Sequence, residues 1–147
     1  MISITVKPYK DLSIDELYSL LRLRSEVFVV EQNCVYQDMD EKDKKAIHIL
    51  GLKNNEIVAY ARIFKPDDYF KEASIGRVVV SQKERGSGLG YEIMNASIKA
   101  ILDEFQEYNI KVSAQKYLKK FYNNLGFKQV GEEYLEDGIP HIAMIKN

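Results

Sequence analysis

Glycines at alternate positions follow a short apolar run in the middle of the chain. The run is Val78-Val79-Val80, and the glycines are Gly86, Gly88 and Gly90. Glycine has no Cβ, so successive backbone N–H groups can point in one direction, and a helix start adds partial positive charge. A strand, a glycine-rich turn and a helix start in this order favour the binding of an anion. A pyrophosphate would fit such a site.

Two common phosphate-binding motifs do not match this segment. A Walker loop ends in Gly-Lys-Ser/Thr, whereas the segment ends in Gly88-Leu89-Gly90. A dinucleotide fingerprint requires a third glycine at the position that Tyr91 occupies. A nucleotide-binding fold of another kind is therefore disfavoured. The glycines alone also leave open a tight strand-to-helix turn that binds no ligand.

The elements that would position these glycines follow from hydrophobic periodicity. Alternating or β-branched runs predict strands, and apolar residues spaced by three and four predict helices. Asn54-Asn55 and Asp137-Gly138 predict hairpin turns. The predicted order is βαβββαβαββ, which is a mixed α/β fold (α+β) with a partly antiparallel and partly parallel sheet. The strands are expected over 2–7, 47–50, 57–63, 75–80, 110–114, 128–135 and 139–145, and the helices over 13–30, 89–105 and 118–125.

Length and composition predict one globular domain over residues 1–147. Hydrophobic residues make up 46% and charged residues 29%, and the net charge is −1. This balance gives no basic surface for nucleic acid, so no nucleic-acid partner is expected. The longest apolar run, Val27 to Val30, is far short of the roughly 18 residues that a membrane helix needs. The chain start has no basic leader, so a cytoplasmic protein is expected.

Cysteine and histidine give no metal-binding pattern. One cysteine excludes an intrachain disulfide and a zinc site with several cysteines. His48 and His141 are the two histidines and lie far apart in the sequence, so no metal is expected. Cys34 could act as a nucleophile, but no Cys-His-Asp pattern accompanies it, and a free thiol usually behaves as a small apolar side chain.

Two motifs resemble those of the GNAT superfamily of N-acetyltransferases. Arg85-x-x-Gly88-x-Gly90 after the valine run is similar to that family's acyl-CoA motif. Ala114-Gln115, followed by Phe121-Tyr122-Asn123-Asn124-Leu125-Gly126-Phe127, is similar to its second motif. Residues 27–37 and 136–141 further resemble the ElaA-like branch. The resemblance covers nearly the whole chain and implies a splayed sheet of about seven strands flanked by about four helices.

The resemblance implies acetyl-coenzyme A as the co-substrate. The valine strand would pair with the pantetheine arm, the turn amides would hold the pyrophosphate, and an N–H near Val79 or Val80 would stabilise the thioester oxygen during attack. Lys116, Lys119 and Lys120 would either meet the nucleotide phosphate or simply be solvated. The implied cofactor-binding residues are Val78, Val79, Val80, Arg85, Gly86, Ser87, Gly88, Leu89, Gly90, Tyr91 and Gln115.

The implied reaction is direct transfer of an acetyl group to a primary amine. Tyr122 occupies the family position of the acid that protonates the leaving thiolate, although it also lies on an apolar helical stripe and could simply pack. Some relatives place a carboxylate base at the start of the preceding strand, where this chain has Ile110. The base must then come from elsewhere or act through water. The candidate groups are Glu31, His48, Glu72, Asp137 and His141.

Two functions of different classes follow. The first is an N-acetyltransferase acting on a small-molecule or peptide amine. The second is a non-catalytic module that binds or senses acyl-CoA, because Ile110 cannot take a proton. Members of the resembled family often pair through edge strands, so a homodimer is a further expectation.

Overall fold

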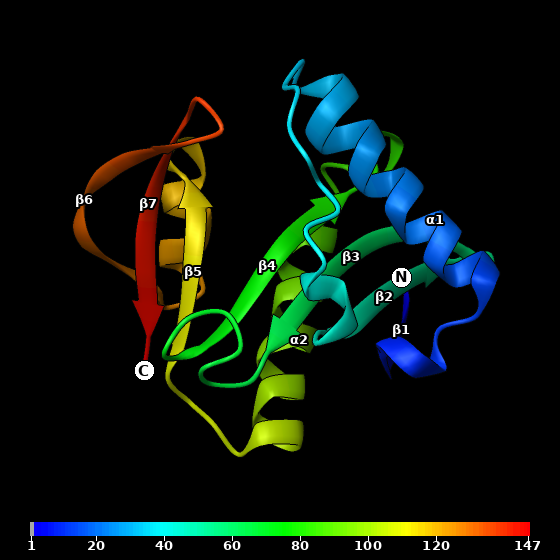
Figure 1. Cartoon of the computed structure of the whole chain (residues 1–147), viewed down its shortest axis with the longest axis horizontal. Coiled ribbons are helices and arrows are strands. Elements are labelled where there is room, and N and C mark those ends of the chain that lie inside the picture. The colour runs from blue at the N-terminus through cyan, green and yellow to red at the C-terminus, as the bar shows by residue number, and fades with distance from the viewer. Residues whose placement is uncertain (1) are drawn as a thin grey trace.

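The computed structural model describes residues 2–147, whose strands form one seven-stranded mixed sheet (Figure 1). The strand order is β1-β2-β3-β4-β5-β7-β6. Neighbouring strands are antiparallel, except that β4 and β5 are parallel. The strands are β1 Ser3–Pro8, β2 Ile47–Lys53, β3 Glu56–Phe64, β4 Ala73–Val80, β5 Ile110–Gln115, β6 Lys128–Glu136 and β7 Ile139–Lys146. The α-helices are α1 Ile14–Arg24, α2 Leu89–Phe105 and α3 Lys119–Asn124.

The predicted order of strands and helices is confirmed, but the number of helices is lower than expected. The described chain has three α-helices instead of about four. The segment predicted as one helix over 13–30 changes its winding, because Ser25–Glu31 continues α1 as a π-helix. This segment carries Val27, Val29 and Val30, and β-branched residues are less favourable in an α-helix. None of the helices within residues 2–147 is long and apolar enough to span a membrane.

Local sequence signals explain where several elements begin and end. Ser13 caps α1, since its hydroxyl accepts a hydrogen bond from the Glu16 N–H at 3.0 Å and the Glu16 carboxylate accepts one from the Ser13 N–H. Asn54 and Asn55 join β2 to β3 with φ values of 53° and 64°. Both angles lie in the left-handed region that asparagine tolerates, so the hairpin predicted here is confirmed.

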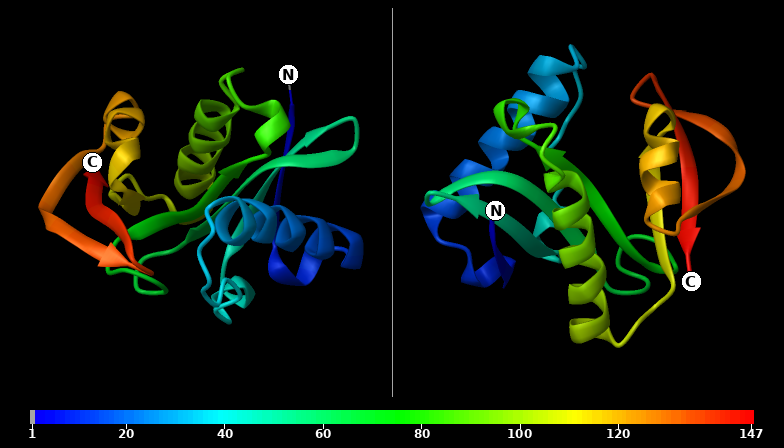
Figure 2. Two further views of the ribbon diagram at one scale, coloured as in Figure 1. Left: turned by 90° about the horizontal axis from the view of Figure 1, so that it is seen from above. Right: turned by 180° about the vertical axis from the view of Figure 1, so that it is seen from behind.

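Helices cover both faces of the sheet (Figure 2). The core between the sheet and α2 and α3 includes Ile93, Ile101 and Phe127, each at most 1% exposed. A second, smaller core lies under α1 and includes Leu20 and Leu23. Apolar residues at helical spacing on α2 and α1 produce these two cores, as the periodicity predicted.

The sheet opens in its middle, between β4 and β5. These strands pair only at Ala73 with Ile110 and Ser74 with Lys111 within the described chain. Beyond that point they diverge, as Figure 1 shows. Arg77 has a φ of 50°, and the register of β4 against β3 shifts around it. This bulge changes the direction of β4 where it leaves its neighbour, so the splayed sheet that the resemblance implied is present.

Candidate active site

A cleft with a volume of about 740 Å³ occupies the opening between β4 and β5. It is bounded by the open edge of β4, by the glycine turn and the start of α2, by α3, by the π-helical segment, and by the β6–β7 turn. The cleft therefore brings together segments that are far apart in the sequence. Of the predicted site residues, those that line it are Glu31, Val78, Val79, Val80, Arg85, Gly86, Gly88, Leu89, Gly90, Tyr91, Gln115, Tyr122, Asp137 and His141.

The glycine turn presents unpaired backbone N–H groups. Within residues 2–147, the amides of Gly86, Ser87 and Gly88 donate to no protein acceptor, and α2 makes its first backbone bond from Glu92 to Gly88 at 3.2 Å. The first N–H groups of α2 are therefore also free. Gly86 and Gly88 have φ values of 87° and 83°, and no atom lies within 4 Å of the position of a Cβ on either residue. The turn thus offers several donors to an anion.

The third glycine of the motif has a different role from the first two. A Cβ on Gly90 would lie 3.2 Å from the Phe121 ring, so glycine here lets α2 approach α3 closely. Tyr91 extends the same contact, with its ring centroid 4.7 Å from that of Phe121. The Ser87 side chain does not line the cleft, because its hydroxyl donates to the Glu84 carbonyl oxygen at 2.9 Å. Ser87 therefore offers its unpaired backbone N–H rather than its side chain.

Arg85 and Glu31 form an ion pair at the edge of the cleft. Arg85 Nη2 donates to Glu31 Oε1 at 3.0 Å, and Nη1 contacts the other carboxylate oxygen. Arg85 Nε also donates to the Val80 carbonyl oxygen at 3.2 Å. The motif arginine therefore ties the π-helical segment to the end of β4, and it occupies both carboxylate oxygens of Glu31.

Tyr122 reaches the cleft from α3 and lies in an apolar environment. The residue is 6% exposed, and its ring makes edge contacts with Phe121 and Phe127 at centroid distances of 5.0 and 5.9 Å. Its hydroxyl has no hydrogen-bond partner among the described residues. Burial raises the pKa of Tyr122, so the phenol is protonated at neutral pH. The packing and the cleft-facing position expected from the sequence are both present in this one residue.

His48 does not line the cleft. It is fully buried on β2, where Nε2 lies 2.9 Å from the Asp43 carbonyl oxygen and Nδ1 lies 2.6 Å from the Tyr60 hydroxyl. A carbonyl oxygen can only accept, so Nε2 carries the proton and Nδ1 accepts from Tyr60. The structure therefore removes His48 from the candidate bases, and Glu72 also lies outside the cleft.

The burial of His48 predicts a pH dependence of stability. Burial lowers the pKa of His48, so between its folded pKa and its unfolded value of about 6.5 the unfolded chain binds more protons. Stability is then present above about pH 6.5 and falls as the pH decreases. We expect the free energy of unfolding, from urea titrations, to decrease between pH 7 and pH 5, and His48→Gln to flatten that slope. An unchanged slope in the variant would contradict this assignment.

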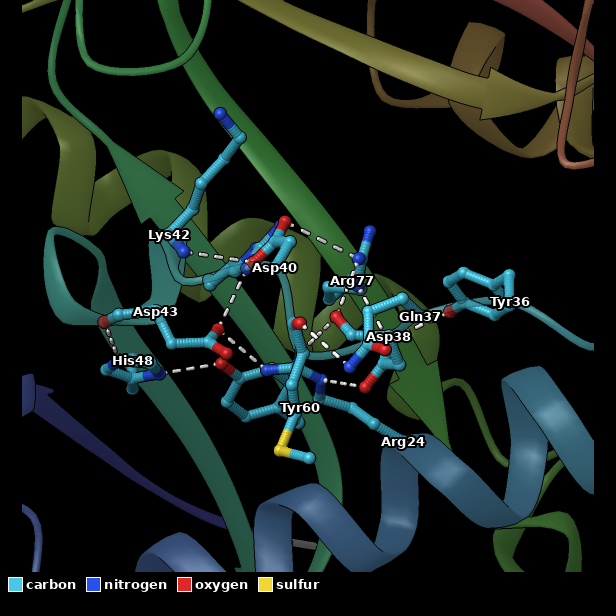
Figure 3. Close-up of polar contacts among 12 residues, drawn as sticks. Arg24, Tyr36, Gln37, Asp38, Asp40, Lys42, Asp43, His48, Tyr60 and Arg77 are labelled. Carbon is cyan, nitrogen blue, oxygen red and sulfur yellow. Dashed lines mark hydrogen bonds and ion pairs between the residues drawn. The ribbon is translucent and has the colours of Figure 1, made fainter.

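A buried charge network was missed from the sequence (Figure 3). Asp43 accepts hydrogen bonds from Arg24 at 2.7 Å and from Arg62 at 2.8 Å. Asp38 pairs with Arg24 and Arg77, each at 2.9 Å or less. Burial by itself raises the pKa of Asp43, but Arg24 and Arg62 outweigh it and hold that pKa below its usual range. The network fastens the segment after the π-helix to β3 and to the β4 bulge.

Polar side chains also line the cleft on the side of β5, β7 and β6, namely those of Ser113, Glu136 and His141. Ser113 donates to Glu136 Oε1 at 3.1 Å and bonds the Tyr134 hydroxyl. Glu136 Oε2 lies 3.5 Å from His141 Nε2. The His141 ring stacks on Tyr134, with centroids 6.2 Å apart. The sequence identified His141 alone, because Ser113, Tyr134 and Glu136 meet it only through strand pairing.

The remaining predicted residues are divided between the cleft and the surface. Asp137 and Cys34 line the cleft, with Cys34 Sγ 3.5 Å from the Asp137 carbonyl oxygen. The three lysines considered for phosphate contact, Lys116, Lys119 and Lys120, do not line it, and Lys116 pairs with Glu133 at 2.7 Å. Within residues 2–147, no three His, Cys, Asp or Glu residues are grouped to hold a metal ion.

Comparisons with known proteins agree with this geometry. A family model described as an acetyltransferase (GNAT) domain matches residues 8–147. ElaA of Escherichia coli (strain K12) is 46% identical over 140 residues, which is 94% of this chain and 92% of ElaA. The crystal structure of Escherichia coli ElaA matches over the whole of both chains with a TM-score of 0.93 and 44% identity.

A second solved structure is equally similar. An acyl-CoA N-acyltransferase from Pseudomonas aeruginosa matches with a TM-score of 0.94 and 40% identity, again over 100% of each chain. The family model covers far more than half of the chain, and the similarity to ElaA extends over nearly all of it. The chain therefore belongs to the GNAT acetyltransferase family and resembles its ElaA-like members.

Proposed function

We propose that this protein is an acetyl-CoA-dependent N-acetyltransferase that moves an acetyl group to a primary amine by direct transfer in a ternary complex. Acetyl-CoA would supply the thioester that the amine attacks. The observation that carries the proposal is the set of unpaired amides between Gly86 and Tyr91, beside the open edge of β4. Backbone donors at a helix start fit a diphosphate, and an open strand edge fits an extended amide-containing arm.

The backbone of β4 would bind and orient the acyl donor. On the side that faces β5, the edge from Val78 to Val80 has no strand partner, so the backbone groups that point to this side are available to the pantetheine arm, apart from the Val80 carbonyl oxygen that accepts from Arg85. An N–H at Val79 or Val80 would stabilise the negative charge that develops on the thioester oxygen. Gln115 lines the opposite side of the opening, where its amide could contact the same arm.

Tyr122 would protonate the leaving sulfur. Its hydroxyl has no partner among the described residues, and its raised pKa keeps the proton on oxygen until a strong acceptor arrives. The thiolate that forms when the thioester breaks is such an acceptor. The closely packed aromatic rings of Phe121 and Phe127 hold the phenol in place.

One observation favours the non-catalytic alternative, an acyl-CoA-binding module. Ile110, at the position where some relatives have a carboxylate, is 1% exposed and lies in the core. It therefore contributes neither a proton acceptor nor a polar contact. Acetyl-CoA binding with no transfer to any amine in a broad panel would support this alternative over the enzyme.

Isothermal titration with acetyl-CoA tests whether the glycine turn binds the diphosphate. Gly88→Ala places a Cβ at a φ of 83°, in the space that the turn leaves open. We expect affinity to fall about 10- to 100-fold, as for the loss of one or two charge-assisted hydrogen bonds. Gly131→Ala is the matched control, because Gly131 also has a positive φ (74°) and open space but lies outside the cleft. Equal affinity of the wild type, Gly88→Ala and Gly131→Ala for acetyl-CoA would overturn the proposal.

A further inference from the structure

We propose that His141 is the general base that deprotonates the acceptor amine, and that Glu136 binds the ammonium form of that amine. This inference rests on the proposed function, because it assigns the acceptor side of the same cleft. It identifies the acceptor as a primary alkyl amine that arrives protonated. The argument depends on the tautomer of His141, on the groups around Glu136 and on the balance of charge in the cleft.

The contacts of His141 leave one nitrogen available as a base. Nδ1 lies 2.7 Å from the Ile139 carbonyl oxygen, which can only accept, so Nδ1 carries the proton. The lone pair is then on Nε2, on the side of the ring near Glu136. Its side chain is 8% exposed and lines the cleft, so the ring is held in place yet reachable by a ligand. A neutral imidazole with a fixed tautomer is the usual proton acceptor near pH 7.

Glu136 is positioned to bind a cation beside that nitrogen. Oε1 accepts the Ser113 hydroxyl at 3.1 Å, and Ser113 also bonds the Tyr134 hydroxyl. Among residues 2–147, the one ion pair or hydrogen bond of Oε2 is the contact with His141 Nε2, at 3.5 Å. An ammonium group near Oε2 would therefore lie next to the basic nitrogen. Ser113 and Tyr134 hold the carboxylate in this orientation.

The charges that face the cleft favour a cationic acceptor. Glu31 on the π-helical segment is paired with Arg85, and Arg77 on β4 is paired with Asp38. Glu136 on β6 and Asp137 on the β6–β7 turn have no lysine or arginine partner among residues 2–147. Cys34, on the segment opposite this turn, places its Sγ 3.5 Å from the Asp137 carbonyl oxygen and adds no charge. The acceptor side of the cleft is therefore negative, which attracts an ammonium group.

Strand alternation separates the base from the acid. His141 and Ile142 are consecutive on β7 and point to opposite faces of the sheet. Ile142 lies in the core that contains Tyr122, so His141 reaches the cleft from the other face. A thioester between these two faces would meet the amine on one side and the proton donor for sulfur on the other.

The proton balance of the reaction follows from these positions. The ammonium gives one proton to His141 Nε2, and its nitrogen lone pair then forms the C–N bond to the thioester carbon. The C–S bond breaks with its electron pair on sulfur, which takes the proton of Tyr122. The attacking nitrogen loses a second proton, which restores Tyr122, and His141 releases its proton to water. One proton therefore leaves for each amide formed.

The test compares two amines in an assay of thiol release with amide product measured directly. n-Butylamine is protonated at neutral pH and needs a base, whereas methoxyamine is already neutral. His141→Gln is expected to lower transfer to n-butylamine by about 10²- to 10⁴-fold and to change transfer to methoxyamine by much less. Glu136→Gln is expected to raise KM for n-butylamine about 10- to 100-fold. Glu133→Gln is the matched control, because Glu133 is on the same strand but outside the cleft.

Each outcome supports or contradicts the inference. Equal loss with both amines would show that His141 only maintains the structure, and no loss with either would remove it from the reaction. Wild-type transfer to methoxyamine but not to n-butylamine would also overturn the inference while leaving the acetyltransferase intact. Acetyl-CoA binding without transfer to either amine, or to any amine of the broader panel, would overturn the proposed function itself.

Discussion

Replacing Asp43 by alanine is expected to lower the free energy of unfolding by about 3–5 kcal/mol. Asp43 Oδ1 accepts from the guanidinium groups of Arg24 and Arg62, whose side chains are at most 1% exposed. Removing the carboxylate leaves two buried cations with less compensation, and buried charges are costly without partners. Urea unfolding at pH 7 measures the change.

The matched control for this substitution is a carboxylate whose ion pair is exposed. Asp103 pairs with Lys99 on the surface of α2, and its side chain is 51% exposed. Asp103→Ala is expected to cost less than about 1 kcal/mol, because solvent screens such pairs. If the two variants lost similar stability, the buried network would not be a major contributor to the fold.

Replacing Tyr122 by phenylalanine is expected to lower kcat about 10²- to 10⁴-fold, the usual loss when a positioned proton donor is removed. The hydroxyl has no protein partner within residues 2–147, and phenylalanine keeps the ring contacts with Phe121 and Phe127. The Kd for acetyl-CoA and the melting temperature are therefore expected to stay close to those of the wild type. Thiol release under saturating acetyl-CoA, together with isothermal titration, separates the two effects.

Tyr108→Phe serves as the comparison for the tyrosine substitution, since Tyr108 is 71% exposed and lies outside the cleft. Its kcat is expected to equal that of the wild type. Unchanged thiol release in Tyr122→Phe would exclude the phenol as the acid. A fall in acetyl-CoA affinity comparable to the fall in kcat would assign Tyr122 to binding rather than to proton transfer.

Features that depend on local sequence could be predicted before the structure. The glycine turn ahead of α2 and the Asn54-Asn55 hairpin follow from residues that tolerate a positive φ. The order of strands and helices along the chain follows from apolar runs with a period of two and of about 3.6. In each case neighbouring residues alone determine the backbone conformation.

Features that depend on long-range pairing could not be predicted. Asp38, Asp40 and Asp43 have the composition of a solvated loop, yet they neutralise arginines from α1, β3 and β4. His48 is a plausible base in the sequence, but strand pairing buries it beside Tyr60. Polar residues on separate strands give no periodic signal, so their meeting is visible only once the register is known.

Some residues of the candidate site could likewise be predicted from local sequence, and others could not. The motif residues from Arg85 to Tyr91 could be found because one short segment supplies them all. The Ser113, Glu136 and His141 group could not, because it takes one residue from each of three strands. The pairing of Arg85 with Glu31 was also unexpected, since the motif gives no sign of an intramolecular partner.

The short contact between β4 and β5 has a mechanical consequence. Two residue pairs join the halves of the sheet, at Ala73 and Ser74, so the halves are connected as if by a hinge near one end. Elsewhere the halves are joined by side-chain packing, such as that of Tyr91 on α2 against Phe121 on α3. A molecule that bridges both halves would act as a brace and stiffen the whole sheet, including strands that it never contacts.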